Sequence, residues 1–270
     1  MITENGDMRI FLREKDNSVF QPYLDAFLCD GAVSPLGAVV IIPGGGYDHR
    51  AYHEGDPVAR RFNDLGFHAF VLQYRTLPDP FPGAQLDVLR AVKLIRSLAD
   101  EFRVNPDQIA AMGFSAGGHL AACAGLMYNE FDEKCGDKAD DFSGRPDALI
   151  LCYPVASVTE TYFELNRQMG KNTPYCRADG SPIDPCKMVT ADTPPTYIWH
   201  TATDQVVPVN GSVEFAKEMW RCGNICDLHI FPCGPHGQGL WLGAPDASMW
   251  PKQAAVFLQK RVGFTAAFEN

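Results

Sequence analysis

The sequence lacks the features of a membrane protein, a secreted precursor or a nucleic-acid-binding protein. Within its 270 residues no apolar run approaches the roughly 20 residues that span a bilayer. Residues 1–7 contain no apolar core of a signal peptide, so we expect a cytoplasmic protein. Basic clusters are also missing, and 23 Lys and Arg against 33 Asp and Glu give a net charge of −10. We therefore expect neither nucleic acid nor a membrane as a partner.

Paired cysteines of the kind that bind zinc are missing as well. The nine cysteines are scattered along the chain, and Cys222-x-x-x-Cys226 has no matching second pair. We therefore expect no metal site. Cys176 and Cys186 lie in the same loop, and the sequence leaves open whether they pair, although a reducing compartment disfavours a disulfide.

Strand-like and helix-like segments alternate along the chain. Residues 38–42 form a continuous β-branched run, which is typical of a strand buried on both faces. Residues 85–102 repeat apolar side chains at helical spacing. The alternation predicts right-handed βαβ crossovers and a mainly parallel sheet flanked by helices, a three-layer α/β sandwich formed by one domain over residues 1–270. Further strands are expected at 9–13, 22–28, 67–74, 108–113, 147–153, 196–201 and 227–231, and further helices at 55–65, 118–125, 212–221 and 251–262.

The segment Gly113-Phe-Ser-Ala-Gly117 lies between a predicted strand and a predicted helix. A strand that turns sharply into a helix raises Ser115 to the tip of the turn. Glycines are needed where the two backbones nearly touch, and the start of the helix offers unpaired amide groups beside the serine oxygen. The five-residue pattern also arises by chance, but its flanking elements favour a nucleophile elbow.

A nucleophilic serine needs a base, and the base needs an orienting carboxylate. Both are expected beyond the carboxyl ends of neighbouring strands, where parallel sheets carry their chemistry. Asp204 follows the strand at 196–201, and His236 follows the strand at 227–231. The order Ser115, Asp204, His236 is the order of nucleophile, acid and histidine in α/β-hydrolases. We predict these three as the catalytic residues.

Other histidines and aspartates occupy less suitable positions. His119 lies inside the helix after the elbow, where we expect it to pack or to form a hydrogen bond. His200 and His229 lie within strands, where a satisfied histidine is the usual case. Asp192 precedes a strand, and Asp246 follows the predicted catalytic histidine, which is out of order.

A glycine-rich loop, Pro43-Gly-Gly-Gly-Tyr47, follows the strand at 38–42. Three glycines let backbone N–H groups approach a ligand, which favours an oxyanion hole over a simple flexible turn. The expected donors are the amides of Gly45, Gly46 and Ala116. The sequence does not decide which of the two glycines donates.

Residues 154–195 are the least regular part of the chain and carry several prolines and tyrosines. A long irregular segment in a compact domain usually covers or binds a ligand, so we expect an insertion that covers the substrate. Ordinary loop packing remains the alternative. Residues expected to contact the substrate are Tyr47, His53 and Tyr153.

The motifs together resemble one branch of the α/β-hydrolases. They are similar to the acetylxylan-esterase-like and feruloyl-esterase-like (BD-FAE-like) carbohydrate esterases, which are related to the hormone-sensitive-lipase-like esterases. The resemblance spans about residues 23–262. The matching stretches are Ile42-Pro-Gly-Gly-Gly-Tyr47, His53-Glu-Gly55, Tyr74-Arg75, Gly113-Phe-Ser-Ala-Gly-Gly-His-Leu-Ala121, Tyr153-Pro-Val155, His200-Thr-Ala-x-Asp204 with Val-Val-Pro208, and His236-Gly-x-Gly-Leu240.

Two positions depart from the pattern of that branch and its relatives. Pro43 stands where the lipase-like branch has a histidine before its glycines. Thr203 stands where a second aspartate is common, which leaves Asp204 as the acid of that pair.

The resemblance implies a serine hydrolase of carboxylic esters that uses no metal and no organic cofactor. It implies short acyl esters, often acetyl groups on sugars, and a small acetylated sugar such as a xylo-oligosaccharide is the expected substrate. An amide or formamide hydrolase of formamidase-like or peptidase-like kind on the same fold is the alternative. A non-catalytic binding protein is disfavoured by the complete Ser, Asp and His set. The acyl-chain length, the natural ester and the choice between monomer and homo-oligomer are left open.

Overall fold

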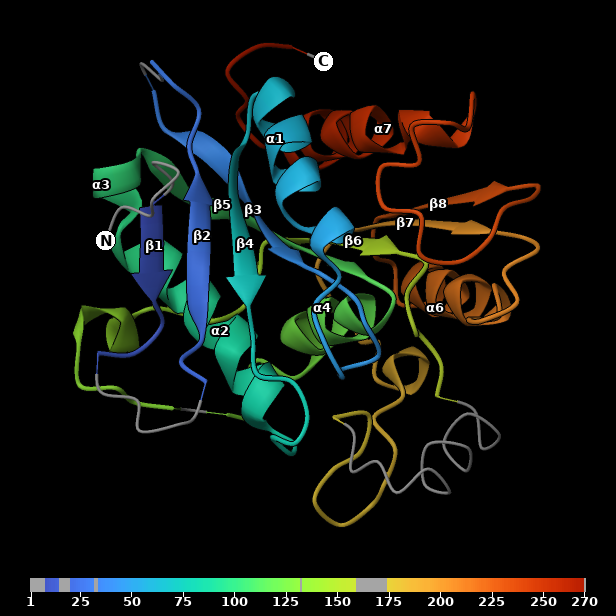
Figure 1. Ribbon diagram of the computed structural model, residues 1–270, viewed down its shortest axis with the longest axis horizontal. Helices are drawn as coiled ribbons and strands as arrows, with labels where there is room; N and C mark the ends of the chain where they lie inside the picture. The colour runs from blue at the N-terminus through green and yellow to red at the C-terminus, as the bar shows by residue number, and fades with distance from the viewer. Residues whose placement is uncertain (1–7, 15–19, 32–33, 132, 159–173, 270) are drawn as a thin grey trace.

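The computed structural model describes residues 8–14, 20–31, 34–131, 133–158 and 174–269 (Figure 1). Within these ranges one eight-stranded sheet has the strand order β1-β2-β4-β3-β5-β6-β7-β8. The pairs β1–β2 and β2–β4 are antiparallel, and all the following pairs are parallel. The strands are β1 (Met8–Phe11), β2 (Tyr23–Phe27), β3 (Leu36–Ile42), β4 (His68–Gln73), β5 (Val104–Phe114), β6 (Ala148–Cys152), β7 (Thr196–Thr201) and β8 (Cys226–Phe231).

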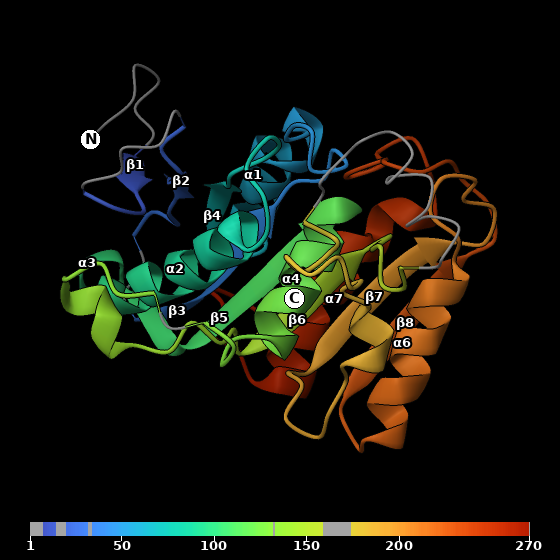
Figure 2. The ribbon, with the colours of Figure 1, turned by 90° about the horizontal axis from the view of Figure 1, so that it is seen from below.

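Helices cover both faces of this sheet, as Figure 2 shows. One face packs against α2 (Gly83–Ser97), α4 (Ala116–Leu126) and α6 (Asn210–Arg221). The other packs against α1 (Asp56–Asp64) and α7 (Trp250–Phe257). The predicted α/β-hydrolase architecture, a mainly parallel sheet in a three-layer sandwich, is confirmed. Shorter elements are α3 (Ala99–Phe102), the 3-10 helices η1 (Tyr52–Glu54), η2 (Lys138–Asp141), η3 (Pro185–Lys187) and η4 (Ala247–Met249), and the π-helix η5 (Leu258–Val262).

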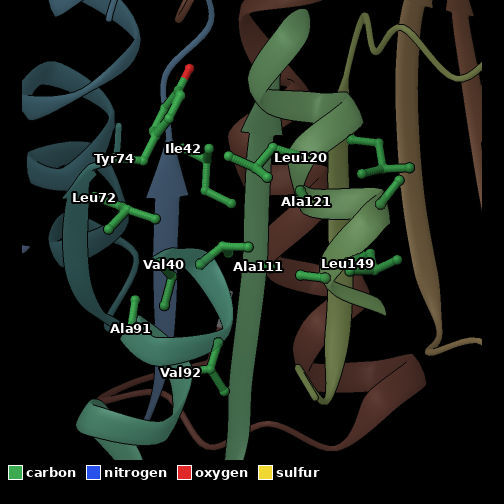
Figure 3. Packing of buried hydrophobic residues seen from close by; sticks show 14 of the residues in the cluster. Val40, Ile42, Leu72, Tyr74, Ala91, Val92, Ala111, Leu120, Ala121 and Leu149 are labelled. Atoms are coloured by element: carbon green, nitrogen blue, oxygen red, sulfur yellow. The ribbon is translucent and has the colours of Figure 1, made fainter. Parts of the chain in front are cut away.

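The central strand β3 is buried along its whole length, which explains its unbroken apolar sequence. Its side chains alternate between two apolar clusters. Val40 and Ile42 point toward α2 and α4 (Figure 3), whereas Val39 and Ile41 pack toward α1 and α7. Burying each such side chain stabilises the fold by about 2 kcal/mol. The carboxyl end of β3, where the glycine loop begins, is therefore firmly held.

Several element ends shift by a few residues, as in β5, which begins at Val104 and not at 108, and two predicted helices differ in kind. The helix predicted over residues 85–102 is two helices, because the chain leaves α-helical geometry at Leu98, whose amide donates to both Leu94 and Ile95. The helix predicted over 251–262 ends as the π-helix η5, closed by Gly263 in the left-handed region with φ +89°. Neither difference moves a strand end that carries a predicted catalytic residue.

The predicted covering insertion at 154–195 is described only in part, since residues 159–173 lie outside the described residues. Its described portion contains η3 and an isolated bridge between Cys176 and Pro182. Cys176 and Cys186 are both free thiols, and the Cys186 thiol donates to the carbonyl of Ala156 at 3.0 Å. None of the helices in the described ranges combines the length and the apolar character that crossing a bilayer demands.

Candidate active site

The nucleophile elbow has the tight geometry that its glycines imply. Ser115 joins β5 to α4 with φ 53° and ψ −116°, an unusual conformation for a residue with a side chain. A Cβ on Gly113 would lie 1.9 Å from the carbonyl oxygen of Gly117, and a Cβ on Gly117 would lie 2.1 Å from that of Ile42. Only glycine fits at these two positions, so the backbone itself presents the serine at the tip of the turn.

The three predicted catalytic side chains meet at this tip. The Nε2 atom of His236 lies 2.7 Å from the hydroxyl oxygen of Ser115. Its Nδ1 atom lies 2.6 Å from Oδ2 of Asp204. Because a carboxylate only accepts, Nδ1 carries the proton, and Nε2 of the neutral ring is left to accept from the serine hydroxyl. The arrangement gives Ser115 a base within hydrogen-bonding distance.

Asp204 is held as an anion although its side chain is only 1% exposed. Burial by itself would raise the pKa of Asp204, but hydrogen bonds from His200, His236 and two amides outweigh burial and hold that pKa well below its usual range. The amides belong to Val206 and Val207 and reach Oδ1 at 2.8 and 2.9 Å. The anion can therefore orient His236 and stabilise its protonated form.

His200, which the sequence analysis treats as an ordinary strand histidine, contacts this acid directly. It is fully buried, and its Nε2 atom lies 3.2 Å from Oδ2 of Asp204 and 3.0 Å from the carbonyl of Val207. Two acceptors around Nε2 require its proton there, so Nδ1 accepts from the hydroxyl of Ser212 at 2.8 Å. His200 lies in β7 and Asp204 in the loop that follows, so the four-residue spacing between them does not by itself predict the contact.

Thr203, one of the two departures from the family pattern, links the two loops that carry Asp204 and His236. Its hydroxyl accepts from the amide of Gly234 at 3.0 Å. The hydroxyl of Thr201 donates to the carbonyl of the same glycine at 2.9 Å. Thr203 thus joins the loop that carries Asp204 to the loop that carries His236.

The glycine loop lies against the elbow and leaves the predicted oxyanion donors available. The amide of Gly44 donates to Oε2 of Glu54 at 2.7 Å, which removes it from the candidates. Within the described ranges no acceptor is assigned to the amides of Gly45, Gly46 or Ala116. Gly45 and Gly46 have φ values of +119° and +63°, which only glycine adopts readily. The choice between these two glycines stays a prediction.

Two of the predicted substrate contacts lie beneath the site rather than on its surface. Tyr47 and Tyr153 are 0% and 2% exposed, so neither presents surface to a substrate in this structure. The third, His53, has a side chain that is 57% exposed, and its Nε2 lies 2.8 Å from the carbonyl oxygen of Gly237, the residue after His236. Contact between these residues and the substrate stays a prediction.

His119 packs and forms hydrogen bonds, in line with the expectation for a histidine inside the elbow helix. Its Nε2 donates to the carbonyl of Ile183 at 2.9 Å, and its Nδ1 lies 2.8 Å from the hydroxyl of Tyr47. Burial lowers the pKa of His119 to about 4, so the ring is neutral near pH 7 and Nδ1 accepts from the tyrosine. The contact ties the glycine loop to the elbow helix.

Comparison with known proteins finds a family and relatives that match most of the chain. Residues 24–219 match the BD-FAE family. The chain is 34% identical over 224 residues to the endo-1,4-beta-xylanase B of Butyrivibrio fibrisolvens, with 81% of this chain and 35% of that protein covered. It is 30% identical over 215 residues to an acetylxylan esterase of Xylanibacter ruminicola, with coverages of 76% and 42%. The chain therefore spans less than half the length of these curated relatives.

A solved structure matches over nearly the full length. The acetyl ester-xyloside bifunctional hydrolase of Caldicellulosiruptor lactoaceticus superposes with a TM-score of 0.85 at 36% identity, covering 95% of this chain and 97% of that one. From the family match and this full-length likeness, the chain belongs to the BD-FAE family of the α/β-hydrolase fold.

Proposed function

We propose that this protein is a serine hydrolase of carboxylic esters that works through an acyl-enzyme intermediate. The observation that carries the proposal is the continuous chain of contacts from Ser115 through His236 to Asp204, at 2.7 and 2.6 Å. The Ser115 hydroxyl donates to Nε2 of His236, and Nδ1–H of His236 donates to Asp204. These directions let His236 remove the proton from the serine.

In the first half-reaction the hydroxyl oxygen of Ser115 attacks the ester carbonyl carbon while Nε2 of His236 takes the hydroxyl proton. Negative charge develops on the carbonyl oxygen, and the amide of Ala116 with that of Gly45 or Gly46 stabilises it. The carbon–oxygen bond to the alcohol then breaks, and His236 returns its proton to the leaving alcohol. The acyl group remains on Ser115.

In the second half-reaction a water molecule takes the place of the alcohol. His236 takes a proton from the water as its oxygen adds to the acyl carbon, and then passes that proton to the departing oxygen of Ser115. The acid is released and the free serine is restored. Asp204 holds the imidazole in one tautomer throughout and stabilises its charged form.

The proposed substrates are short acyl esters, with acetyl esters of xylo-oligosaccharides or other small sugars first among them. The names of the acetylxylan esterase from Xylanibacter ruminicola and the acetyl ester-xyloside hydrolase from Caldicellulosiruptor lactoaceticus support this choice. A panel of acetylated xylo-oligosaccharides, medium-chain p-nitrophenyl esters and N-formylkynurenine tests it. Turnover of the medium-chain esters alone would remove the sugar substrate, and turnover of the formamide alone would replace the ester proposal with a formamidase.

The direct test of the serine mechanism is the variant Ser115→Ala assayed on an acetyl ester. Loss of the nucleophile should lower kcat by about a millionfold. Ser248→Ala, a partly exposed serine on η4, is the matched control and should keep the kcat of the unaltered protein. Turnover by Ser115→Ala close to that of the control would contradict the proposal.

A further inference from the structure

The carboxylate of Glu54 contacts the glycine loop and a tyrosine beside the catalytic histidine without belonging to the triad. It is 2% exposed and ends the short helix η1. Its Oε2 atom accepts from the amide of Gly44 at 2.7 Å, and its Oε1 atom accepts from the hydroxyl of Tyr153 at 2.6 Å. One side chain thus joins the segment after β3 to the segment after β6.

Tyr153 carries this connection onward to the loop of the catalytic histidine. Its oxygen accepts from the amide of Gly239 at 2.8 Å, and its ring packs at a steep angle on the ring of His236 with centroids 5.0 Å apart. Burial, and then the neighbouring carboxylate of Glu54, raise the pKa of Tyr153 well above its ordinary value, so the phenol stays protonated and donates. The indole of Trp250 is the last member of this series of hydrogen bonds and donates to the carbonyl of Gly239 at 3.0 Å.

The other end of the connection touches the nucleophile. A Cβ on Gly44 would lie 2.7 Å from the carbonyl oxygen of Phe114 and 3.0 Å from the Cβ of Ser115, so the glycine loop rests directly on the elbow. Because Glu54 accepts from the amide of Gly44, it fixes the plane of the Pro43–Gly44 peptide, which directly precedes the two peptides that carry the amides of Gly45 and Gly46. The orientation of the predicted oxyanion donors therefore depends on this carboxylate.

The chemistry of the contact calls for a carboxylate and not merely for a side chain that fills the space. Two donors, an amide and a phenol, converge on Glu54 from opposite sides. A carboxylate accepts on both oxygens, whereas a carboxamide accepts on one atom and donates on the other. An apolar residue would leave two buried donors unsatisfied. The sequence therefore uses a buried charged group where packing alone would prefer an apolar one.

We propose that Glu54 and Tyr153 are positioning residues that hold the oxyanion loop and the loop of His236 at one fixed separation around Ser115. Fixed donors stabilise developing charge without reorganising during the reaction, so their effect is felt in the transition state more than in substrate binding. The inference rests on the proposed esterase function. It adds the contact that keeps the oxyanion loop aligned with the loop of His236.

The test compares Glu54→Gln and Tyr153→Phe with the unaltered protein on an acetyl ester. Each variant should lose about 10- to 100-fold in kcat while KM changes by less than about threefold, because small displacements of positioned groups cost rate more than binding. The double variant should lose less than the product of the two single losses, since both remove the same contact. Asp64→Asn, an exposed acid at the end of α1, is the matched control and should leave both constants unchanged.

A transition-state analogue separates positioning from a purely structural role. A trifluoromethyl ketone that adds to the serine should bind more weakly to both variants, in proportion to their loss of kcat/KM, while binding of the product alcohol stays the same. Circular dichroism verifies folding, and Tyr153→Phe decides the matter if Glu54→Gln does not fold. Folded variants with kcat and analogue affinity within twofold of the unaltered protein would overturn the inference. The esterase proposal itself is tested separately, by the activity of Ser115→Ala.

Discussion

The elbow and the two loops that carry Asp204 and His236 are held in place by different means. At the elbow, backbone lies against backbone, and a Cβ on Gly117 would lie 2.1 Å from the carbonyl of Ile42. On the loops, side chains form the contacts, as when His200 reaches Asp204 and Thr203 reaches Gly234. The first region tolerates no added atom, whereas the second depends on individual hydrogen bonds. We therefore expect changes at the elbow glycines to damage the fold, and changes on the loops to damage the rate alone.

Among changes on the two loops, the largest effect on rate without loss of fold is expected for Asp204→Asn. The amide oxygen can still accept from Val206 and Val207, but an NH2 group facing His236 forces the imidazole into the wrong tautomer. On this basis kcat for an acetyl ester should fall about ten-thousandfold while the melting temperature stays close to that of the unaltered protein. Asp246→Asn is the control, because the sequence offered Asp246 as the other nearby acid. If both variants lost the same factor in kcat, the assignment of Asp204 as the acid of the triad would be wrong.

Gly117→Ala should behave in the opposite way. The added methyl group has no space beside the carbonyl of Ile42, so β3 and α4 must move apart at a cost of about 3 kcal/mol of unfolding free energy. Activity and stability should fall together, with kcat lowered by about 100-fold because Ser115 is displaced. Gly243→Ala is the control, since a Cβ there meets nothing within 4 Å. If Gly117→Ala lost kcat but kept its unfolding free energy, the elbow would behave like the loops and the proposed difference between the two regions would be wrong.

Thr203→Val tests the link between the two loops. Removing the hydroxyl leaves the amide of Gly234 without this acceptor, and the loop of His236 should then sample more positions. We expect kcat to fall about tenfold with KM nearly unchanged. Thr203→Ser keeps the hydroxyl and should keep most of the rate. If valine and serine gave the same kcat, the link would have no part in placing the histidine.

The smallest effect is a change in the pH dependence of stability at His119, which ties the glycine loop to the elbow helix. The unfolded chain binds a proton there at the ordinary value of 6.5, whereas the folded chain, with the pKa of His119 lowered to about 4, does so only at lower pH. Between these values the unfolded state holds more protons, so the free energy of unfolding falls as the pH decreases, by up to about 1.4 kcal/mol per pH unit.

Denaturant unfolding between pH 7 and pH 4 measures this slope. His119→Gln should flatten it by about 1.4 kcal/mol per pH unit, whatever the variant's stability at pH 7. The same replacement at the exposed His49 is the control and should leave the slope as it was. An unchanged slope in His119→Gln would mean that the buried ring already binds a proton near pH 6.5.

The sheet, the sharp turn at Ser115 and the meeting of Ser115, Asp204 and His236 follow from the sequence because each depends on a local pattern. The buried run at residues 38–42 and the glycines around Ser115 reflect steric demands within a few residues. Asp204 and His236 are recognisable because each follows a strand, and parallel strands bring their carboxyl ends to one edge.

Most of the supporting contacts could not be predicted because the two partners lie far apart in the sequence. Glu54 lies within the family-like stretch His53-Glu-Gly55, yet it is separated from its partner Tyr153 by 99 positions. The burial of Tyr47 and Tyr153, which the sequence analysis expects to contact the substrate, is likewise set by tertiary packing. Hydrogen bonds between distant segments are set by the whole fold, so no single stretch encodes them.

The most direct test of the account is covalent labelling with a fluorophosphonate probe followed by peptide mapping, since the probe reacts with an activated serine. We predict one adduct, on Ser115, formed rapidly in the unaltered protein, absent in Ser115→Ala and strongly slowed in His236→Ala because the base is missing. An adduct on a different residue, or equal labelling of Ser115 with and without His236, would contradict the claim that these side chains act as one catalytic unit.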